Sequence, residues 1–229
     1  MRYVENALRL GQTAVLERSV EISPSGIAAD LGVPTGARGI VIFAHGSGSS
    51  RFSSRNRFVA AELHRAGFAT LLLDLLTSGE EEIDSRTRQL RFDIDLLAGR
   101  LMEATNWTGE NPDLGRLPIG YFGASTGAAA ALIAAARLTQ RIHAVVSRGG
   151  RPDLAASALS SVTASVLLIV GGEDAPVIDL NRNALGQLSC EKKLEIVPGA
   201  SHLFEEPGAL EQVSRLAAAW FDQHLTRPA

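Results

Sequence analysis

The sequence predicts one α/β domain spanning residues 1–229, built on a mostly parallel, twisted sheet of about eight strands with an antiparallel N-terminal edge and helices on both faces. Three observations favour this fold class. Short apolar runs alternate with segments of helical spacing, the first two strand-like segments flank a tight turn, and no repeat or low-complexity linker divides the chain. Strands that alternate with helices form parallel sheets covered on both sides.

The N-terminal edge is expected to be a hairpin. Apolar and polar residues alternate over residues 13–22 and 26–33, and the intervening S-P-S-G is a turn signal. Residues 40–44 then form a continuous apolar, β-branched run, which is typical of a strand covered on both faces. The chain therefore enters the buried part of the sheet after the hairpin.

From that point the pattern alternates between helices and strands. The expected helices are residues 55–65, 88–105, the alanine-rich segment after Ser125, 154–159, 177–188 and 208–224. The expected strands are residues 68–73, 118–122, 144–147, 166–170 and 193–197. Only residues 149–163 connect the sixth and seventh strands, which leaves room for one short helix and for no cap domain.

Composition and charge exclude several classes of function. The net charge is -3, from 22 basic and 25 acidic residues, so the chain offers no basic field for nucleic acid. Cys190 is the single cysteine, which excludes an internal disulfide. No apolar run approaches the length of a membrane span, and residues 1–10 lack a charged-then-apolar leader. We therefore expect a cytoplasmic monomer or homodimer with a small-molecule partner, no membrane or nucleic-acid partner, no cofactor and no metal.

Chemically capable side chains recur at the carboxyl ends of the expected strands, where open α/β sheets bind their ligands. These ends carry His45 to Gly48, Asp74, Ser125, Ser147 with Arg148, Glu173 with Asp174, and Ser201 with His202. A nucleophile, an acid and an imidazole are thus expected along one edge of the sheet.

Ser125 is the candidate nucleophile. It lies in G-A-S-T-G, which matches G-x-S-x-G between an apolar strand and an alanine-rich helix. A serine exposed at such a turn needs neighbours without bulk, and Gly123 and Gly127 meet that need. The following helix directs unpaired N–H groups at the point where negative charge develops.

His202 is the candidate base and Asp174 the candidate acid. Only two of the five histidines, His45 and His202, lie at strand ends, and His45 is better suited to shaping its glycine-rich loop. An imidazole base needs an anionic partner on its other nitrogen. Asp174 is favoured because it follows a Gly-Gly turn and precedes a proline; the alternatives that stay open are Glu173, Asp153 and Asp179.

The glycine-rich loop H-G-S-G after the third strand is a candidate oxyanion site. The backbone N–H groups of Ser47 and Thr126 are expected to bind the oxyanion together. Further candidates for substrate binding are His45, Arg51, Arg55 and Arg57, because arginine offers a bidentate fork to a carboxylate or phosphate. The alternative for the arginines is a solvated loop paired with nearby acids such as Asp74.

These segments together resemble the α/β-hydrolase superfamily, and within it the small, lidless members of the dienelactone-hydrolase-like branch. The resemblance covers nearly the whole chain from Val15 and is carried by H-G-S-G-S-S, L-L-L-D-L-L, G-A-S-T-G, G-G-E-D-A-P-V and G-A-S-H-L-F. The chain is similar in particular to hydrolase domains found alone or fused to phosphoribosyltransferase-like domains. The resemblance implies Ser125, Asp174 and His202 as a triad. Dienelactone hydrolase proper has a cysteine nucleophile, so its substrate does not carry over.

The predicted function is that of a serine hydrolase that cleaves small acyl esters, as a carboxylesterase does, through an acyl-enzyme on Ser125. An open site favours small or soluble acyl groups over long lipids, because little apolar wall exists to bury a chain. The same triad would also serve a thioesterase, an amidase or an acyltransferase. A non-catalytic small-molecule-binding homologue is the alternative from another class, and a complete triad argues against it.

Overall fold

An eight-stranded sheet forms the centre of the structure, a computed structural model that describes residues 14–225. Residues 1–13 and 226–229 lie outside the described residues. Two sequence expectations fall there: the absence of a leader at residues 1–10, and residue 13, the first of the first expected strand. The strands are β1 (Val15–Ile22), β2 (Ile27–Pro34), β3 (Ile40–Ala44), β4 (Ala69–Leu73), β5 (Ile119–Ala124), β6 (Ile142–Arg148), β7 (Ser165–Gly171) and β8 (Lys192–Val197).

Helices connect the parallel strands. The α-helices are α1 (Ser54–Arg65), α2 (Ser78–Thr87), α3 (Ile94–Glu110), α4 (Thr126–Arg137), α5 (Ala175–Gln187) and α6 (Ala209–His224). Two 3₁₀ helices are η1 (Leu90–Phe92) and η2 (Pro152–Ser161), and η2 takes the place of the short helix expected at residues 154–159. Apart from short loops, η2 is all that lies between β6 and β7.

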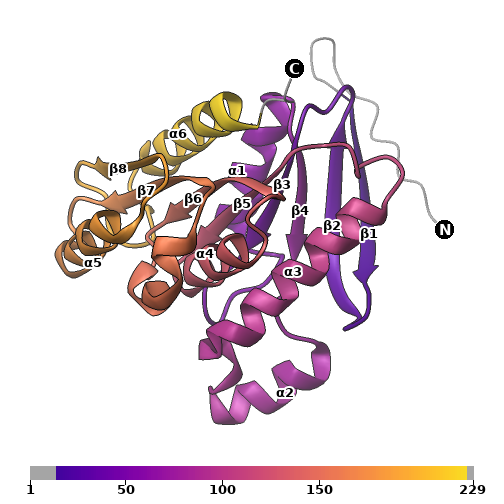
Figure 1. The fold of residues 1–229 in the computed structure, drawn as a ribbon, viewed down its shortest axis with the longest axis horizontal. Coiled ribbons are helices and arrows are strands. Elements are labelled where there is room, and N and C mark those ends of the chain that lie inside the picture. The colour runs from indigo at the N-terminus through magenta and orange to yellow at the C-terminus, as the bar shows by residue number, and fades with distance from the viewer. Residues whose placement is uncertain (1–13, 226–229) are drawn as a thin grey trace.

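The strand order is β1-β2-β4-β3-β5-β6-β7-β8 (Figure 1). The β1–β2 hairpin is antiparallel and joins β4 in antiparallel fashion, while every pair from β4 to β8 is parallel. This arrangement confirms the predicted fold class. Because the parallel strands share one direction, their carboxyl ends meet at a single edge.

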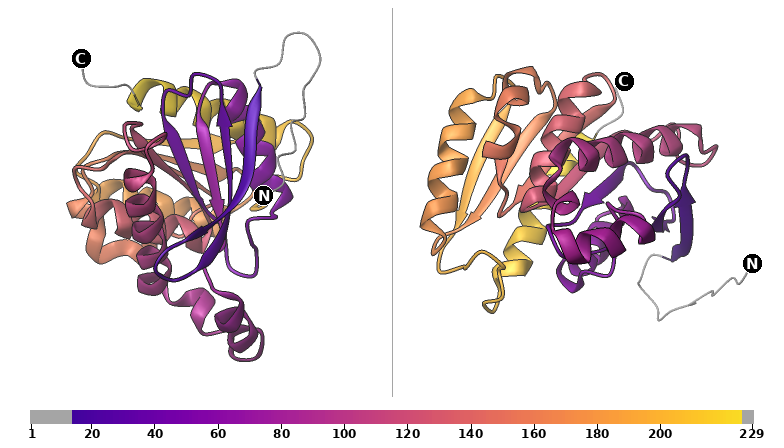
Figure 2. Two further views of the ribbon diagram at one scale, coloured as in Figure 1. Left: turned by 90° about the vertical axis from the view of Figure 1, so that its right-hand side faces the viewer. Right: turned by 90° about the horizontal axis from the view of Figure 1, so that it is seen from below.

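The central strands are buried on both faces, as their continuous apolar runs predict. In β3, Ile40 and Ile42 join one hydrophobic core, whereas Val41 and Phe43 join the other, because successive side chains of a strand point to opposite faces. Helices α3 and α4 pack over the first core, and α1 and α6 pack over the second (Figure 2). The sheet is therefore enclosed between two helical layers.

The segment after β4 differs from the expectation of one helix at residues 88–105. The long helix α3 begins later, because the Asp93 carboxylate caps it by accepting a hydrogen bond from the Leu96 N–H at 3.0 Å. Before it lies α2, which the sequence reasoning missed. This helix begins at a capping box in which the side chains of Thr77 and Glu80 each accept a hydrogen bond from the other's backbone N–H.

Helix α2 projects from the body of the molecule (Figure 1). Its sequence SGEEEIDSRT has no apolar stripe, and the side chain of Ile83 is exposed. Hydrophobic periodicity could not reveal a helix that does not face a core. The T-x-x-E capping signal at Thr77 was the local feature that could have done so.

The start of α4 passes very close to the end of β3. A Cβ atom on Gly127 would lie 2.4 Å from the carbonyl oxygens of Ala44 and His45, and one on Gly123 would lie 2.4 Å from Cα of Ala128. Backbone atoms fill both spaces and cannot swing aside as a side chain can. Glycine is thus required at these positions for the helix to approach the sheet.

We expect Gly127→Ala to lower the free energy of unfolding by about 2 kcal/mol or more, because the added methyl group overlaps two backbone carbonyls. Gly99→Ala in the interior of α3 is the matched control, since no atom lies within 4 Å of its added Cβ. It should stabilise the protein by about 0.5–1 kcal/mol. Urea unfolding of both variants measures the two changes in stability. Equal changes would contradict the close approach of α4 to the end of β3.

Candidate active site

Ser125 occupies a strained turn between β5 and α4. Its backbone has φ 50° and ψ -120°, a conformation that residues with a side chain rarely adopt. Three backbone hydrogen bonds hold it there: the Ser125 N–H donates to the Arg148 carbonyl at 3.2 Å, and the Ser125 carbonyl accepts from the N–H groups of Ala128 and Arg151, both at 3.1 Å. Strain of this kind is a feature of nucleophile turns.

A cavity of about 250 Å³ opens beside Ser125. Its walls come from the β3–α1 loop, the first turn of α1, the ends of β5 and β6, and the loop after β8. The lining residues are Gly46, Ser47, Ser49, Ser53, Arg55, Asn56, Ala124, Ser125, Arg148, His202 and Leu203. The fold therefore brings Ser125 and His202, which are far apart in the sequence, to the wall of one cavity.

His202 is oriented by Asp174. Nδ1 of His202 lies 2.6 Å from Oδ2 of Asp174, and the two side chains are 38% and 14% exposed. A carboxylate in this position keeps the proton on Nδ1, which leaves Nε2 as the proton acceptor. Among the described residues no hydrogen bond joins Ser125 Oγ to His202; such contacts are often long in enzymes without substrate.

The Asp174 carboxylate is available to His202 because it does not cap helix α5, while a backbone hydrogen bond holds the residue in place. Its N–H donates to the Gly171 carbonyl at 3.1 Å, and its side chain makes no capping bond to α5. Of the alternative acids, Glu173 is exposed, Asp153 receives two hydrogen bonds from Arg151, and Asp179 pairs with Arg182. Within residues 14–225, only Asp174 contacts the His202 ring through a carboxylate.

The two expected oxyanion donors have free backbone N–H groups. Within the described part of the chain, neither the Ser47 nor the Thr126 N–H donates to a protein acceptor. Ser47 lines the cavity, and Thr126 directly follows Ser125. These two N–H groups are therefore available to an oxygen atom bound beside Ser125.

His45 shapes the loop that carries Ser47. Its Nδ1 lies 2.9 Å from the Gly46 carbonyl, and its Nε2 accepts a hydrogen bond from the Leu75 N–H at 3.2 Å. Burial lowers the pKa of His45, so the ring is neutral, with the proton on Nδ1 donated to Gly46. Both ring nitrogens are occupied by backbone groups, and the expectation that His45 contacts substrate has no support from this geometry.

The three arginines expected to bind substrate separate in the structure. Arg55 lines the cavity and pairs with Glu205 at 3.0 Å. Arg51 pairs with Asp74, and Arg57 pairs with Asp30 at 3.0 Å, outside the walls of the Ser125 cavity. Of the three, only Arg55 is placed to reach a ligand beside Ser125, because Asp74 after β4 and Asp30 in β2 hold the other two.

Arg148 is the residue that the sequence reasoning placed at the right edge without giving it a role. It ends β6, lines the cavity with Ser125, and is only 8% exposed. Burial lowers its pKa to about 10, and the neighbouring Arg55 charge acts in the same direction. A charged residue directly after an apolar strand segment was the signal available in the sequence.

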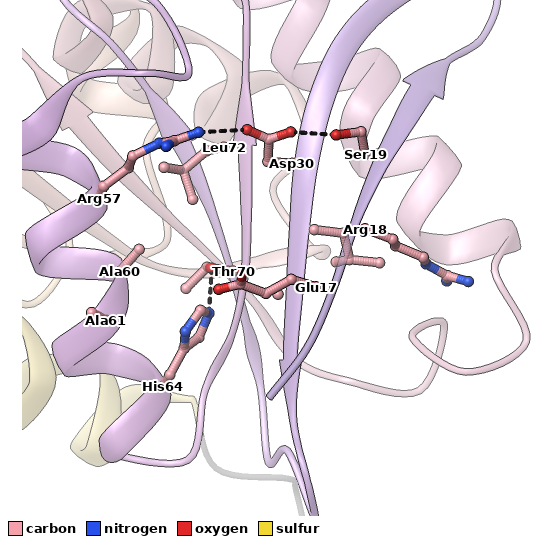
Figure 3. Close-up of a pocket in the computed structure, with 12 residues that line it drawn as sticks. Glu17, Arg18, Ser19, Asp30, Arg57, Ala60, Ala61, His64, Thr70 and Leu72 are labelled. Atoms are coloured by element: carbon pink, nitrogen blue, oxygen red, sulfur yellow. Dashed lines mark hydrogen bonds and ion pairs between the residues drawn. The ribbon is translucent and has the colours of Figure 1, made fainter. Parts of the chain in front are cut away.

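A larger cavity, of about 330 Å³, lies between α1 and the β1, β2 and β4 strands (Figure 3). Arg57 and Ser19 both bond to Asp30 there, and His64 Nε2 lies 2.7 Å from Thr70 Oγ1. Burial lowers the pKa of His64 to about 4. Ser125 and His202, the candidate nucleophile and base, line the smaller cavity, so cavity volume alone does not identify the candidate active site.

Residues 14–225 contain no group of three or more His, Cys, Asp or Glu side chains arranged to hold a metal ion. No helix within that range combines the length and the apolar composition needed to cross a membrane.

Comparisons with known proteins agree with the observed fold and show which family the chain matches. The model of the dienelactone hydrolase family matches residues 27–224. A solved dienelactone hydrolase from Anabaena variabilis is 60% identical, with a TM-score of 0.90 over 93% of this chain and 99% of that chain. The structure of Est1E from Butyrivibrio proteoclasticus is 15% identical, with a TM-score of 0.74 over 90% of this chain and 98% of that chain, and shows the shared fold alone.

Longer relatives occur in two strains of Mycobacterium tuberculosis, where they are named provisionally as phosphoribosyl transferases. They are 57% identical to this chain over 212 residues, which is 93% of this chain and 47% of theirs. The chain therefore spans about half the length of the curated relatives it matches.

The half-buried ring of His64 should make stability depend on pH. In the folded protein it stays neutral down to about pH 4, whereas an unfolded histidine binds a proton near pH 6.5, so the unfolded chain binds more protons between these values. We expect this group to lower the free energy of unfolding by about 2 kcal/mol as pH falls from 7 to 4.

His64→Gln should remove the loss of stability that His64 causes on acidification. The buried His45, whose pKa is also lowered, should still destabilise the protein as the pH falls. The free energy of unfolding of both proteins at pH 8, 6 and 4 checks this. The difference at pH 8, where histidine is neutral in both states, gives the effect of the substitution on packing. An unchanged difference between the two proteins across these pH values would show that the His64 ring is not held neutral.

Proposed function

Because the chain belongs to the dienelactone hydrolase family, we propose that it is a serine hydrolase that cleaves small acyl esters through an acyl-enzyme on Ser125. Family membership places it among the hydrolases; the serine nucleophile and the ester substrate are the proposal. The single observation that carries it is the 2.6 Å contact between His202 and Asp174 beside the cavity that Ser125 lines.

In the proposed reaction, Nε2 of His202 accepts the Ser125 hydroxyl proton as Oγ attacks the acyl carbonyl. Asp174 holds the imidazole in the productive tautomer and stabilises its positive charge. The N–H groups of Ser47 and Thr126 donate to the oxyanion of the tetrahedral intermediate, where each donor is worth about 3 kcal/mol. His202 then protonates the leaving alcohol, and water activated by the same ring releases the acid.

The cavity favours small substrates. Its volume of about 250 Å³ lies below the usual range for drug-sized ligands, and its wall is largely hydroxyl, amide and guanidinium groups. Only η2 and short loops connect β6 to β7, so no inserted domain there adds an apolar wall. A panel of acetyl esters, thioesters and aryl amides of equal acyl length separates ester hydrolysis from the other reactions open to this triad.

We expect Ser125→Ala to abolish hydrolysis of an activated acetyl ester and labelling by a fluorophosphonate, because the substitution removes the hydroxyl held at the strained turn beside His202. Ser160→Ala, at an exposed serine of η2 outside the cavity, is the matched control and should label and turn over as the wild type does. Retained labelling of Ser125→Ala would place the nucleophile elsewhere.

Asp174→Asn should lower kcat by roughly 10⁴-fold, since the amide no longer holds the His202 tautomer or its charge. Glu173→Gln removes the same charge from the adjacent, exposed position and should leave kcat within about 2-fold, because a solvated charge beyond hydrogen-bond reach is largely screened. Steady-state kinetics on one short ester checks both variants. Equal losses of kcat would contradict the assignment of Asp174 as the acid of the triad.

A further inference from the structure

Arg148 carries a buried positive charge without a protein partner. Its side chain is only 8% exposed, and within residues 14–225 its guanidinium forms no ion pair and no hydrogen bond; Nε and Nη1 are fully enclosed. Other arginines near the site, Arg51 and Arg55 among them, each pair with a carboxylate. A buried charge is costly unless it is paired, so the fold maintains Arg148 against a free-energy penalty.

The backbone fixes this charge beside the proposed nucleophile. Arg148 ends β6, where it lies in register with Ala124 of β5 and Ile169 of β7. Its carbonyl accepts the hydrogen bond from the Ser125 N–H, and its side chain lines the same cavity as Ser125 and His202. Because Nε and Nη1 are enclosed, Nη2 is the atom of this guanidinium that is left to contact a group on a molecule bound beside Ser125.

The opposite wall adds further positive potential. Arg55 lies in the first turn of α1 and faces the same cavity; its partner Glu205 is 63% exposed at the rim. That first turn contains no acidic residue, and the start of a helix carries partial positive charge from its free N–H groups. Two guanidinium groups and a helix N-terminus thus converge on one small space, and their mutual repulsion favours an anion between them.

We propose that Arg148 and Arg55 form an anion-binding subsite beside Ser125, and that the preferred substrates are small esters that carry a phosphate group. This inference rests on the proposed function. Arg148 has no carboxylate partner within residues 14–225 and Arg55 has the exposed Glu205, so a ligand that displaces Glu205 meets two positive charges, which suit a phosphate better than a carboxylate. The Ser53 oxygen caps α1 by accepting a hydrogen bond from the Asn56 N–H, which leaves its own O–H and the earlier N–H groups of the helix as donors to a tetrahedral group.

Binding is tested first, without turnover, on Ser125→Ala. Inorganic phosphate is titrated by calorimetry and by thermal unfolding. We expect phosphate to bind and to raise Tm, and Ser125→Ala combined with Arg148→Met to lose both effects. Absence of binding to Ser125→Ala would overturn the subsite, whether or not the enzyme hydrolyses esters.

Arg148→Met should also raise Tm in phosphate-free buffer, because methionine fills the space without a buried charge. A purely structural role for Arg148 predicts the reverse, a lower Tm. Arg148→Lys keeps a charge with fewer fixed donors and should retain weakened phosphate binding. Arg65→Met changes the net charge equally at the far, exposed end of α1 and should leave phosphate binding unchanged.

Specificity is then tested with three esters of one acyl group whose alcohols end in a hydroxyl, a carboxylate or a phosphate. We expect wild-type kcat/KM to be roughly 100-fold higher for the phosphate ester than for the hydroxyl ester, as charged hydrogen bonds allow. Arg148→Met should reduce that ratio at least 10-fold, and the ratio is the readout because any loss common to both esters cancels in it.

A preference for the carboxylate ester would overturn the phosphate assignment, and an equal loss on all three esters would overturn the specificity role. Fluorophosphonate labelling of each variant reports the proposed triad separately. Phosphate binding without labelling would therefore contradict the proposed function and leave the subsite standing.

Discussion

The backbone strain at Ser125 is the constraint on which the rest of the site depends. A positive φ at a serine persists only where surrounding contacts overdetermine it. Here the Ser125 N–H donates to the Arg148 carbonyl, and the Ser125 carbonyl accepts from Ala128 and Arg151. These bonds tie the residue to β6 and to the segment that follows it. The glycines at 123 and 127 let α4 press against β3 at the same point. One turn thus fixes the position of Ser125, leaves the Thr126 N–H without a protein acceptor among the described residues, and ties the site to the end of β6.

The parts of the fold set by buried periodicity could be predicted from the sequence. The parallel strands, the N-terminal hairpin and the placement of Ser125, Asp174 and His202 at one edge follow from apolar runs that end in glycine-rich turns. Hydrophobic periodicity could not reveal α2, because that helix buries no apolar face; only the T-x-x-E capping signal marks its start. Nor could it separate Arg55 from Arg57, two residues apart on one helix, since the acids that select their directions lie on distant segments.

The role of Arg148 was hidden for a related reason. A sequence shows that a charge ends a buried strand, but whether a carboxylate lies opposite depends on three-dimensional neighbours. Arg91 illustrates the other outcome: it lies outside any core strand, yet it closes on the buried carboxylate of Asp84. Pairing, more than burial, distinguishes an arginine that holds the fold together from one held ready for a ligand.

Both outer strands of the sheet expose charged side chains, which has a consequence for self-association. The outward residues of β1 include Glu17 and Arg18, and β8 begins with Lys192 and Lys193. Charged side chains along a free strand oppose its continuation into a neighbouring molecule. Lateral growth into a shared, two-molecule sheet is therefore disfavoured at either border.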